Sequence, residues 1–143
     1  MNKVVLITGA SSGFGHSTAK HLATKGYTVY GTSRKEITDS SIKMIKMDVC
    51  NKASITVAVD YILKQEGRID VLINNAGMGI GGCIELATDE EIDIQMNTNF
   101  RGMSNVCQCV LPVMRKQRNG KIINISSIGG VMGLPYQGYY SAS

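Results

Sequence analysis

Short apolar runs alternate with amphipathic stretches along the whole chain, and this alternation constrains the fold more than any other feature. The first run, Val4-Val5-Leu6-Ile7, is short, uninterrupted and rich in β-branched residues, as in a strand that is buried on both faces. Four later runs also predict strands, at residues 27–32, 42–47, 69–73 and 121–126. Strands that alternate with helices form a parallel sheet with right-handed crossovers and helices on both faces.

The segments between the strands carry apolar residues at helical spacing. One helix is expected over about residues 52–66, and Thr88 with Glu91 resembles a capping box that opens another. A longer helix is expected over about 100–118, although Pro112 inside it would cost about 3 kcal/mol without compensation. The order of elements predicts one α/β domain, a doubly wound, Rossmann-type parallel sheet with strand order 3-2-1-4-5 as far as the chain runs.

Composition excludes several classes of protein. With 143 residues, of which 43% are apolar, the chain can bury a core and is expected to form a single domain. No apolar run approaches the roughly 18 residues of a membrane span, and the start of the chain does not resemble a signal peptide. The net charge of +4 comes from dispersed basic residues, and the densest group, at 115–121, has no aromatic platform for nucleic acid beside it. We therefore expect a cytoplasmic protein that binds neither membranes nor nucleic acids.

The four cysteines form no recognisable metal or disulfide pattern. Cys50, Cys83, Cys107 and Cys109 contain no C-x-x-C pair, and the two histidines are not spaced from them as metal ligands. We expect reduced thiols and no metal site.

A glycine-rich turn, residues 8–15, joins the first strand to the first helix and reads Thr-Gly-Ala-Ser-Ser-Gly-Phe-Gly. Free backbone N–H groups and the positive end of a helix dipole meet at such a turn and favour a phosphate. Gly9 permits the tight turn, Gly13 allows close approach of a pyrophosphate, and Gly15 lets the helix pack closely. The spacing differs from the common G-x-G-x-x-G fingerprint, and a glycine-rich turn without a ligand is the alternative. The cofactor-binding residues expected in this turn are Gly9, Ser11, Ser12, Gly13, Phe14 and Gly15.

The ends of the second and third strands carry residues suited to the adenosine half of a dinucleotide. NAD sites usually place an acid after the second strand, whereas an arginine there accommodates the 2′-phosphate of NADP. This sequence has Ser33 where the acid would stand, followed by Arg34, so it predicts NADP(H) in preference to NAD(H). A surface arginine after a strand is the alternative. Asp48 and Val49 follow the third strand, where the carboxylate can accept a hydrogen bond from the adenine amino group.

Two further motifs lie at the ends of the fourth and fifth strands. Asn-Asn-Ala-Gly at 74–77 ends the fourth strand, and Ser127 at the end of the fifth precedes Tyr140 by 13 residues. Together with the glycine turn and the Asp-Val pair at 48–49, these motifs resemble the short-chain dehydrogenase/reductase family over essentially the whole chain. The resemblance implies that Asn75, Ala76 and Gly77 also contact the cofactor.

The resemblance implies a catalytic set of Asn99, Ser127 and Tyr140. The family's active-site asparagine, in an N-x-x-G pattern, matches Asn99 with Gly102, and its Y-x-x-x-K tyrosine matches Tyr140. The lysine of that motif would stand at position 144, one position beyond Ser143. We therefore expect that residues 1–143 are the N-terminal part of a longer chain and are inactive alone.

The resemblance further implies an NADP(H)-dependent oxidoreductase that interconverts a small-molecule alcohol with a ketone or aldehyde by hydride transfer. Tyr140 would act as general acid or base, Ser127 would hold the substrate oxygen, and Asn99 would hold a water in a proton relay. Each residue singly also fits an ordinary structural role. A non-catalytic NADP(H)-binding or scaffolding protein of the same fold is the alternative. The family commonly forms homodimers and homotetramers through the long helix.

The segments 78–83 and 129–137 are expected to border a substrate cleft. The second segment contains Val131, Met132, Leu134 and Tyr136, which favour an apolar carbonyl substrate. Ordinary loop packing explains them equally well, so the sequence leaves both interpretations open.

The choice of cofactor can be tested at the end of the second strand. Replacing Ser33 with Asp and Arg34 with Leu should reverse the preference, because the new carboxylate repels a 2′-phosphate that Arg34 no longer pairs with. We expect the ratio of kcat/KM values for NADPH and NADH in the complete protein to change by about hundredfold or more. Equal use of both cofactors by the unmodified protein would contradict the prediction.

Overall fold

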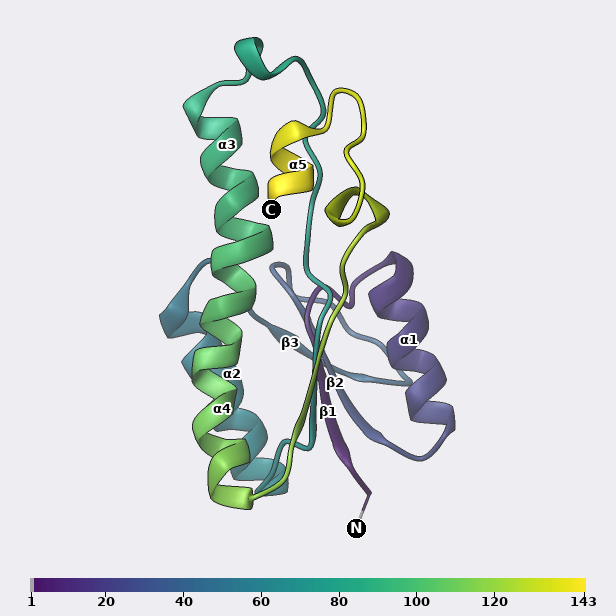
Figure 1. The fold of residues 1–143 in the computed structure, drawn as a ribbon. Coiled ribbons are helices and arrows are strands. Elements are labelled where there is room, and N and C mark those ends of the chain that lie inside the picture. Colours follow the sequence, from purple (N-terminus) through teal and green to yellow (C-terminus); the bar gives the residue numbers. More distant parts are fainter. Residues whose placement is uncertain (1) are drawn as a thin grey trace.

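The computed structural model describes residues 2–143, which form a five-stranded parallel sheet in the order β3-β2-β1-β4-β5 (Figure 1). The central strand β1 pairs with β2 on one side and β4 on the other, so that Leu6 lies between Tyr30 and Leu72. The predicted fold class and strand order are thus confirmed. The strands are β1 (Val4–Ile7), β2 (Thr28–Ser33), β3 (Lys43–Lys46), β4 (Val71–Asn74) and β5 (Lys121–Asn124).

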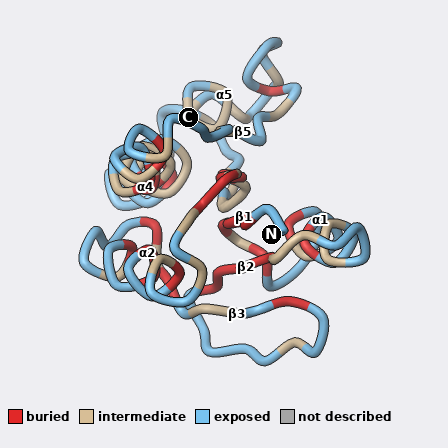
Figure 2. Tube along the Cα trace, turned by 90° about the horizontal axis from the view of Figure 1, so that it is seen from below, coloured by how far each residue is buried: buried red, intermediate tan, exposed pale blue. Residues whose placement is uncertain are grey.

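Helices cover both faces of the sheet. α1 (Gly13–Thr24) lies on one face, and α2 (Lys52–Glu66) and α4 (Met103–Gln117) lie on the other (Figure 2). Successive side chains of a strand point to opposite faces. The first run therefore serves two cores: Val4 and Leu6 pack beneath α2 and α4, and Val5 and Ile7 pack beneath α1.

The chain between β4 and β5 forms one continuous helical rod in which the two predicted helices are joined end to end. α3 (Asp89–Met96) begins with the predicted capping box, in which Thr88 and Glu91 each accept a hydrogen bond from the other's backbone N–H. A π-helical turn, η2 (Asn97–Gly102), then leads directly into α4. Sequence periodicity could not show this junction, because a π turn interrupts the helical repeat.

Three short elements complete the chain at the top of Figure 1, beyond the carboxyl ends of the strands. They are η1 (Ile84–Leu86), η3 (Ile128–Gly130) and α5 (Gly138–Ala142). Within residues 2–143, no helix combines the length and the apolar character that crossing a membrane requires.

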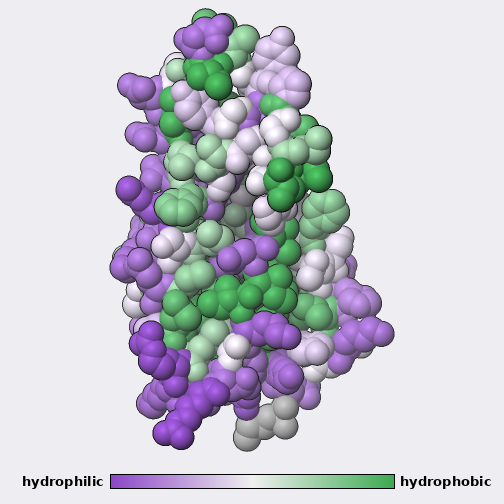
Figure 3. Space-filling view, viewed as in Figure 1, coloured by the Kyte–Doolittle hydropathy of each residue, from purple (hydrophilic) through white to green (hydrophobic). Residues whose placement is uncertain are grey.

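The strand β5 lies at one side of the sheet and carries exposed apolar residues. Among the described residues it pairs with β4 alone. Ile123 and Ile125 are 40% and 54% exposed. Figure 3 shows apolar side chains gathered on this face, in the region that Figure 1 shows between α4 and α1.

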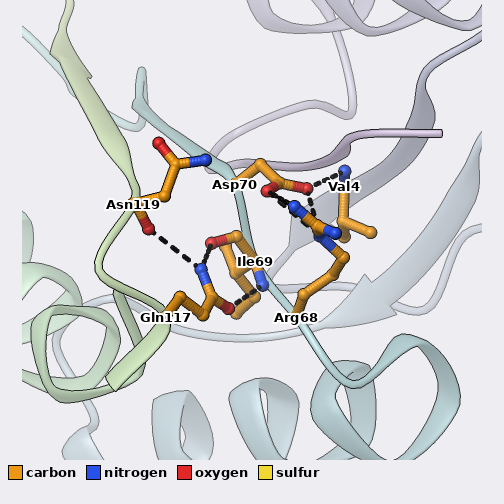
Figure 4. Close-up of polar contacts among 6 residues, drawn as sticks. All are labelled: Val4, Arg68, Ile69, Asp70, Gln117 and Asn119. Atoms are coloured by element: carbon orange, nitrogen blue, oxygen red, sulfur yellow. Dashed lines mark hydrogen bonds and ion pairs between the residues drawn. The ribbon is translucent and has the colours of Figure 1, made fainter. Parts of the chain in front are cut away.

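Two sets of side-chain hydrogen bonds, which we call clamps, lie at the end of the sheet where the strands begin (Figure 4). The Asp70 carboxylate accepts a hydrogen bond from the Val4 N–H at 2.8 Å and pairs with the Arg68 guanidinium. Gln117, at the end of α4, accepts from the Ile69 N–H at 3.0 Å and donates to the Ile69 carbonyl at 2.9 Å. Residues 69 and 70, just before β4, are therefore held to β1 by the Asp70 carboxylate and to α4 by the Gln117 amide.

The Asp70 clamp makes stability depend on pH. Burial alone raises the pKa of this carboxyl, but the Arg68 guanidinium and the Val4 N–H outweigh burial, and the net pKa lies below the ordinary value of 3.8. A carboxyl whose pKa is lower in the folded state stabilises the fold above its unfolded pKa, and this contribution is lost as the pH falls through the folded value.

Replacing Asp70 with Asn should lower the free energy of unfolding by about 1–3 kcal/mol at pH 7, because the charged acceptor is lost. The variant should also lose stability less steeply than the parent below about pH 4. Denaturant unfolding at several pH values measures both effects. The exposed Asp60→Asn on α2 is the control, and identical pH profiles for the two variants would refute the assignment.

Candidate active site

A cleft of about 770 Å³ opens at the carboxyl ends of β4 and β5. Its walls come from the start of α1, the loop after β4, the π turn η2, the loop after β5, and α5. Ligands of open α/β sheets bind at this edge. Of the residues predicted from sequence, the cleft brings together Phe14, Asn75, Ala76, Gly77, Asn99, Ser127 and Tyr140.

The turn before α1 presents an uncapped helix N-terminus. The Ser12 side chain makes no capping hydrogen bond, and the first turn of the helix has no acidic residue. Gly9 and Gly13 have φ values of 66° and 56°, which residues other than glycine rarely adopt. A Cβ atom on Gly13 would meet no protein atom within 4 Å. The exposed stretch Ser11, Ser12, Gly13 and Phe14 therefore faces open space in which free N–H groups favour an anion.

Thr8 and Asn75 join this turn to the end of β4. The Thr8 hydroxyl oxygen accepts hydrogen bonds from the N–H groups of Asn75 and Ala76, at 3.0 and 2.9 Å. The Asn75 amide donates to the carbonyls of Thr8 and Gly9, at 2.9 and 3.0 Å. Gly15 is buried beneath this contact, and a Cβ there would collide with the Asn75 side chain. The glycine turn and the Asn-Asn-Ala-Gly motif are therefore one structural unit.

Ser33 and Arg34 lie at the end of β2, outside the cleft but on the same edge of the sheet. Ser33 is 9% exposed, and its hydroxyl accepts from the N–H of Lys35 at 3.1 Å. Arg34 is exposed. The loop that follows is tied to α1 by a contact of 2.9 Å between His16 Nε2 and the Asp39 carboxylate. This contact, with further hydrogen bonds from Ser41, lowers the pKa of the Asp39 carboxyl well below its ordinary value.

Asp48 and Val49 follow β3, whose carboxyl end lies beside that of β2. The Asp48 carboxylate accepts a hydrogen bond from the Cys50 N–H at 2.9 Å. Val49 is buried, and a Cβ on Gly102 would lie only 2.7 Å from its Cγ2. Gly102 of the N-x-x-G pattern is thus required for close packing of η2 on this segment.

Asn99 lies in the π turn, and its side chain holds the loop after β4. Its Oδ1 accepts from the Met78 N–H at 2.9 Å, while its Nδ2 donates to the Met78 carbonyl at 2.8 Å and to the Ser143 hydroxyl at 2.9 Å. An amide nitrogen has two N–H groups, and both are engaged in these bonds. The water-holding role stays a prediction, and the Asn99 side chain could perform it only as an acceptor.

Ser127 and Tyr140 reach the cleft from η3 and α5. The Ser127 oxygen accepts a hydrogen bond from the Gly129 N–H at 3.2 Å. A hydroxyl has one donor and two acceptor sites, so this bond leaves the Ser127 hydrogen free to donate to an oxygen in the cleft. Tyr140 is half-buried on α5 and lines the same cleft.

Three contributors to the site were not assigned roles from the sequence. The Thr8 hydroxyl accepts from the Asn75 and Ala76 N–H groups, and the Ser143 hydroxyl accepts from the Asn99 amide. Gln95 is a buried amide on α3 that accepts from the Ile80 N–H at 2.6 Å. Their hydrogen-bond partners are distant in the chain, so no short-range pattern in the sequence points to them. Within residues 2–143 no three His, Cys, Asp or Glu side chains are grouped to hold a metal ion.

Comparison with known proteins identifies the family. A family profile described as short chain dehydrogenase matches residues 3–143. The chain belongs to the short-chain dehydrogenase family. A 3-ketodihydrosphingosine reductase of Bacteroides thetaiotaomicron is 62% identical over 142 residues, which cover 99% of this chain and 53% of that protein. The 3-oxoacyl-(acyl-carrier-protein) reductase FabG of Thermotoga maritima is 40% identical, with 99% of this chain and 62% of that protein covered.

Solved structures share the fold closely. The structure of ElxO with NADP bound has a TM-score of 0.93 and 32% sequence identity, and the match covers 99% of this chain and 62% of that one. Aldohexose dehydrogenase of Thermoplasma acidophilum, in ligand-free form, has a TM-score of 0.93 and 30% identity, covering 99% and 55%. The chain thus spans between about half and two thirds of the length of these relatives.

The Thr8 hydroxyl should stabilise this short-chain dehydrogenase measurably. In a Thr8→Val variant two part-buried N–H groups lose their acceptor, and we expect the free energy of unfolding to fall by about 2 kcal/mol. Thr32→Val is the matched control, since Thr32 is equally buried at 1% exposure and its side chain takes no part in these bonds. Equal stabilities of the two variants in denaturant unfolding would show that the Thr8 contact is not a stabilising one.

Proposed function

We propose that the chain is the N-terminal part of an NADP(H)-dependent oxidoreductase that interconverts an alcohol with a ketone or aldehyde. One observation carries the proposal: Asn99, Ser127 and Tyr140, which are far apart in the sequence, line one cleft together with the loop that is bonded to the glycine turn. A non-catalytic binding protein has no need of a serine and a tyrosine hydroxyl in that place.

The residues at the sheet edge fit a dinucleotide phosphate. The uncapped N-terminus of α1 and the open space at Gly13 would take the pyrophosphate. Arg34, which is exposed after β2, would pair with a 2′-phosphate, and the half-buried Asp48 would accept from the adenine amino group. The neighbour ElxO has NADP bound in its structure, which supports the same assignment. When bound, the nicotinamide supplies or accepts the hydride.

The cleft side chains would manage the substrate oxygen and its proton. In the direction of reduction, the Tyr140 hydroxyl donates its proton to the carbonyl oxygen as that oxygen becomes an alkoxide, so that an alcohol is formed. The Ser127 hydroxyl, with its oxygen held by the Gly129 N–H, donates a hydrogen bond to the same oxygen and stabilises the developing negative charge. In oxidation the proton returns to Tyr140.

We further propose that the substrate is a ketone on a long aliphatic chain. The relative from B. thetaiotaomicron is named a 3-ketodihydrosphingosine reductase. The segment between Ser127 and Tyr140 exposes large apolar side chains next to the cleft, as an aliphatic substrate requires. These side chains are Ile128, Val131, Met132 and Tyr136, which are 64%, 83%, 56% and 70% exposed.

Tyr140→Phe in the complete protein should lower kcat for reduction of 3-ketodihydrosphingosine by about 10²–10⁴-fold, because proton transfer is lost. The dissociation constant for NADPH, measured by fluorescence titration, should stay unchanged. The same assay on Ser127→Ala should show a loss of about 10²-fold or more.

Two outcomes would count against the proposal. Turnover by Tyr140→Phe within tenfold of the parent would exclude Tyr140 as the acid. Tight NADPH binding by an unmodified protein that reduces none of a series of long-chain and short-chain ketones would instead favour the non-catalytic alternative.

A further inference from the structure

We propose that Gly79 and Gly129 are positioning residues, which together set the orientation of the Tyr140 ring, and that the buried amide of Gln95 holds Gly79 in place for this purpose. The inference rests on the proposed function, because it assigns these residues a role only through the hydroxyl of Tyr140.

The Tyr140 ring lies between two glycine backbones. A Cβ on Gly79 would lie 3.2 Å from Cδ2 and 3.4 Å from Cε2 of the ring. A Cβ on Gly129 would lie 3.3 Å from both Cδ1 and Cε1, on the opposite edge. Both separations are shorter than an ordinary contact between carbon atoms, which is about 3.5–4.0 Å. A side chain on either glycine would therefore push the ring toward the other.

The loop that carries Gly79 is held on both sides of this glycine. Asn99 bonds both backbone polar groups of Met78, and Gln95 Oε1 accepts from the Ile80 N–H at 2.6 Å. The Gln95 and Asn99 side chains bond residues 80 and 78 of the same loop and therefore lie on one side of the helical rod. The exposed Gly79 is thus fixed by its two neighbours rather than by its own contacts.

The hydrogen bond to the Ile80 N–H is the one interaction that favours an amide at position 95. Gln95 is completely buried, and its Nε2 has no hydrogen-bond partner among the described residues. A buried donor without a partner costs about 1–3 kcal/mol. An apolar residue of similar length would avoid this cost, but it could not accept from the Ile80 N–H.

The same helical rod also holds the backbone that carries Tyr140. Asn99 Nδ2 donates to the Ser143 hydroxyl, which in turn donates to the Tyr140 carbonyl at 3.0 Å. The loop that contacts the Tyr140 ring and the backbone of α5 are therefore both hydrogen-bonded to the same helical rod. This is the arrangement that a proton donor needs, because small displacements from the reactive geometry reduce rates strongly.

The test uses the complete protein and matched glycine-to-alanine pairs. Gly79→Ala and Gly129→Ala place a methyl group against the ring, whereas Gly82→Ala and Gly133→Ala place one in open space in the same two loops. None of the four glycines has a positive φ, so that alanine fits each backbone. We expect the first pair to lower kcat by about tenfold, with KM and the NADPH dissociation constant within about threefold of the parent and an unchanged Tm. The second pair lies in the segments that border the cleft and can change KM for the ketone, but it should not reproduce the fall in kcat, because its methyl groups do not meet the Tyr140 ring.

The amide is tested separately. Gln95→Met keeps the length of the side chain and removes the acceptor, and it should lower kcat by about tenfold. At this completely buried position the carboxyl group of Gln95→Glu should stay protonated, so that its carbonyl oxygen accepts from the Ile80 N–H as the amide does, and kcat should return to within about threefold of the parent.

The outcomes separate this inference from the proposed function. If Tyr140→Phe is inactive but Gly79→Ala and Gly129→Ala keep the parental kcat, the positioning role is refuted and the proposed function stands. Equal losses in all four alanine variants, or a fall in Tm that parallels the fall in kcat, would also overturn it. If Tyr140→Phe is fully active, both fail together.

Discussion

The four hydrogen bonds between the Thr8–Gly9 segment and the Asn75–Ala76 segment are the constraint on which the rest of the site depends. They connect the carboxyl ends of two adjacent strands through side chains, at the point where the backbone ladder of the sheet has ended. One partner carries the turn that opens α1, and the other leads into the loop that is bonded to Asn99. The turn proposed to bind phosphate and the loop beside the proposed catalytic side chains are therefore connected by hydrogen bonds.

Much of the fold could be predicted from local patterns. The uninterrupted run Val4–Ile7 indicates a two-faced strand, and the structure uses it for two cores. The capping box at Thr88 and the strand β5 also follow from short stretches of sequence. Such features depend on neighbours a few residues away, and the physical rules that govern them are strong and local.

The contacts that complete the site could not be predicted in this way. Thr8 and Asn75 are 67 positions apart in the sequence, and His16 and Asp39 are 23 positions apart. The position of Gly79 against Tyr140 depends on a loop whose shape is determined by amides on another element. The resemblance to a family supplied the candidate residues Asn99, Ser127 and Tyr140, but not the finding that the Asn99 amide already has both its N–H groups engaged.

The π turn at Asn97–Gly102 determines how the long helix divides its surface. Gln95, Asn99, Val106 and Val110 are spaced by four, seven and four residues, so a regular α-helix would place all of them in one stripe. The extra residue of a π turn offsets the two halves of this stripe by roughly a quarter of a revolution. The amides then face the loop above the sheet, while Val106 and Val110 stay in the core beside α2 and β4. A single rod can thus support the cleft and the hydrophobic core without placing polar groups in the core.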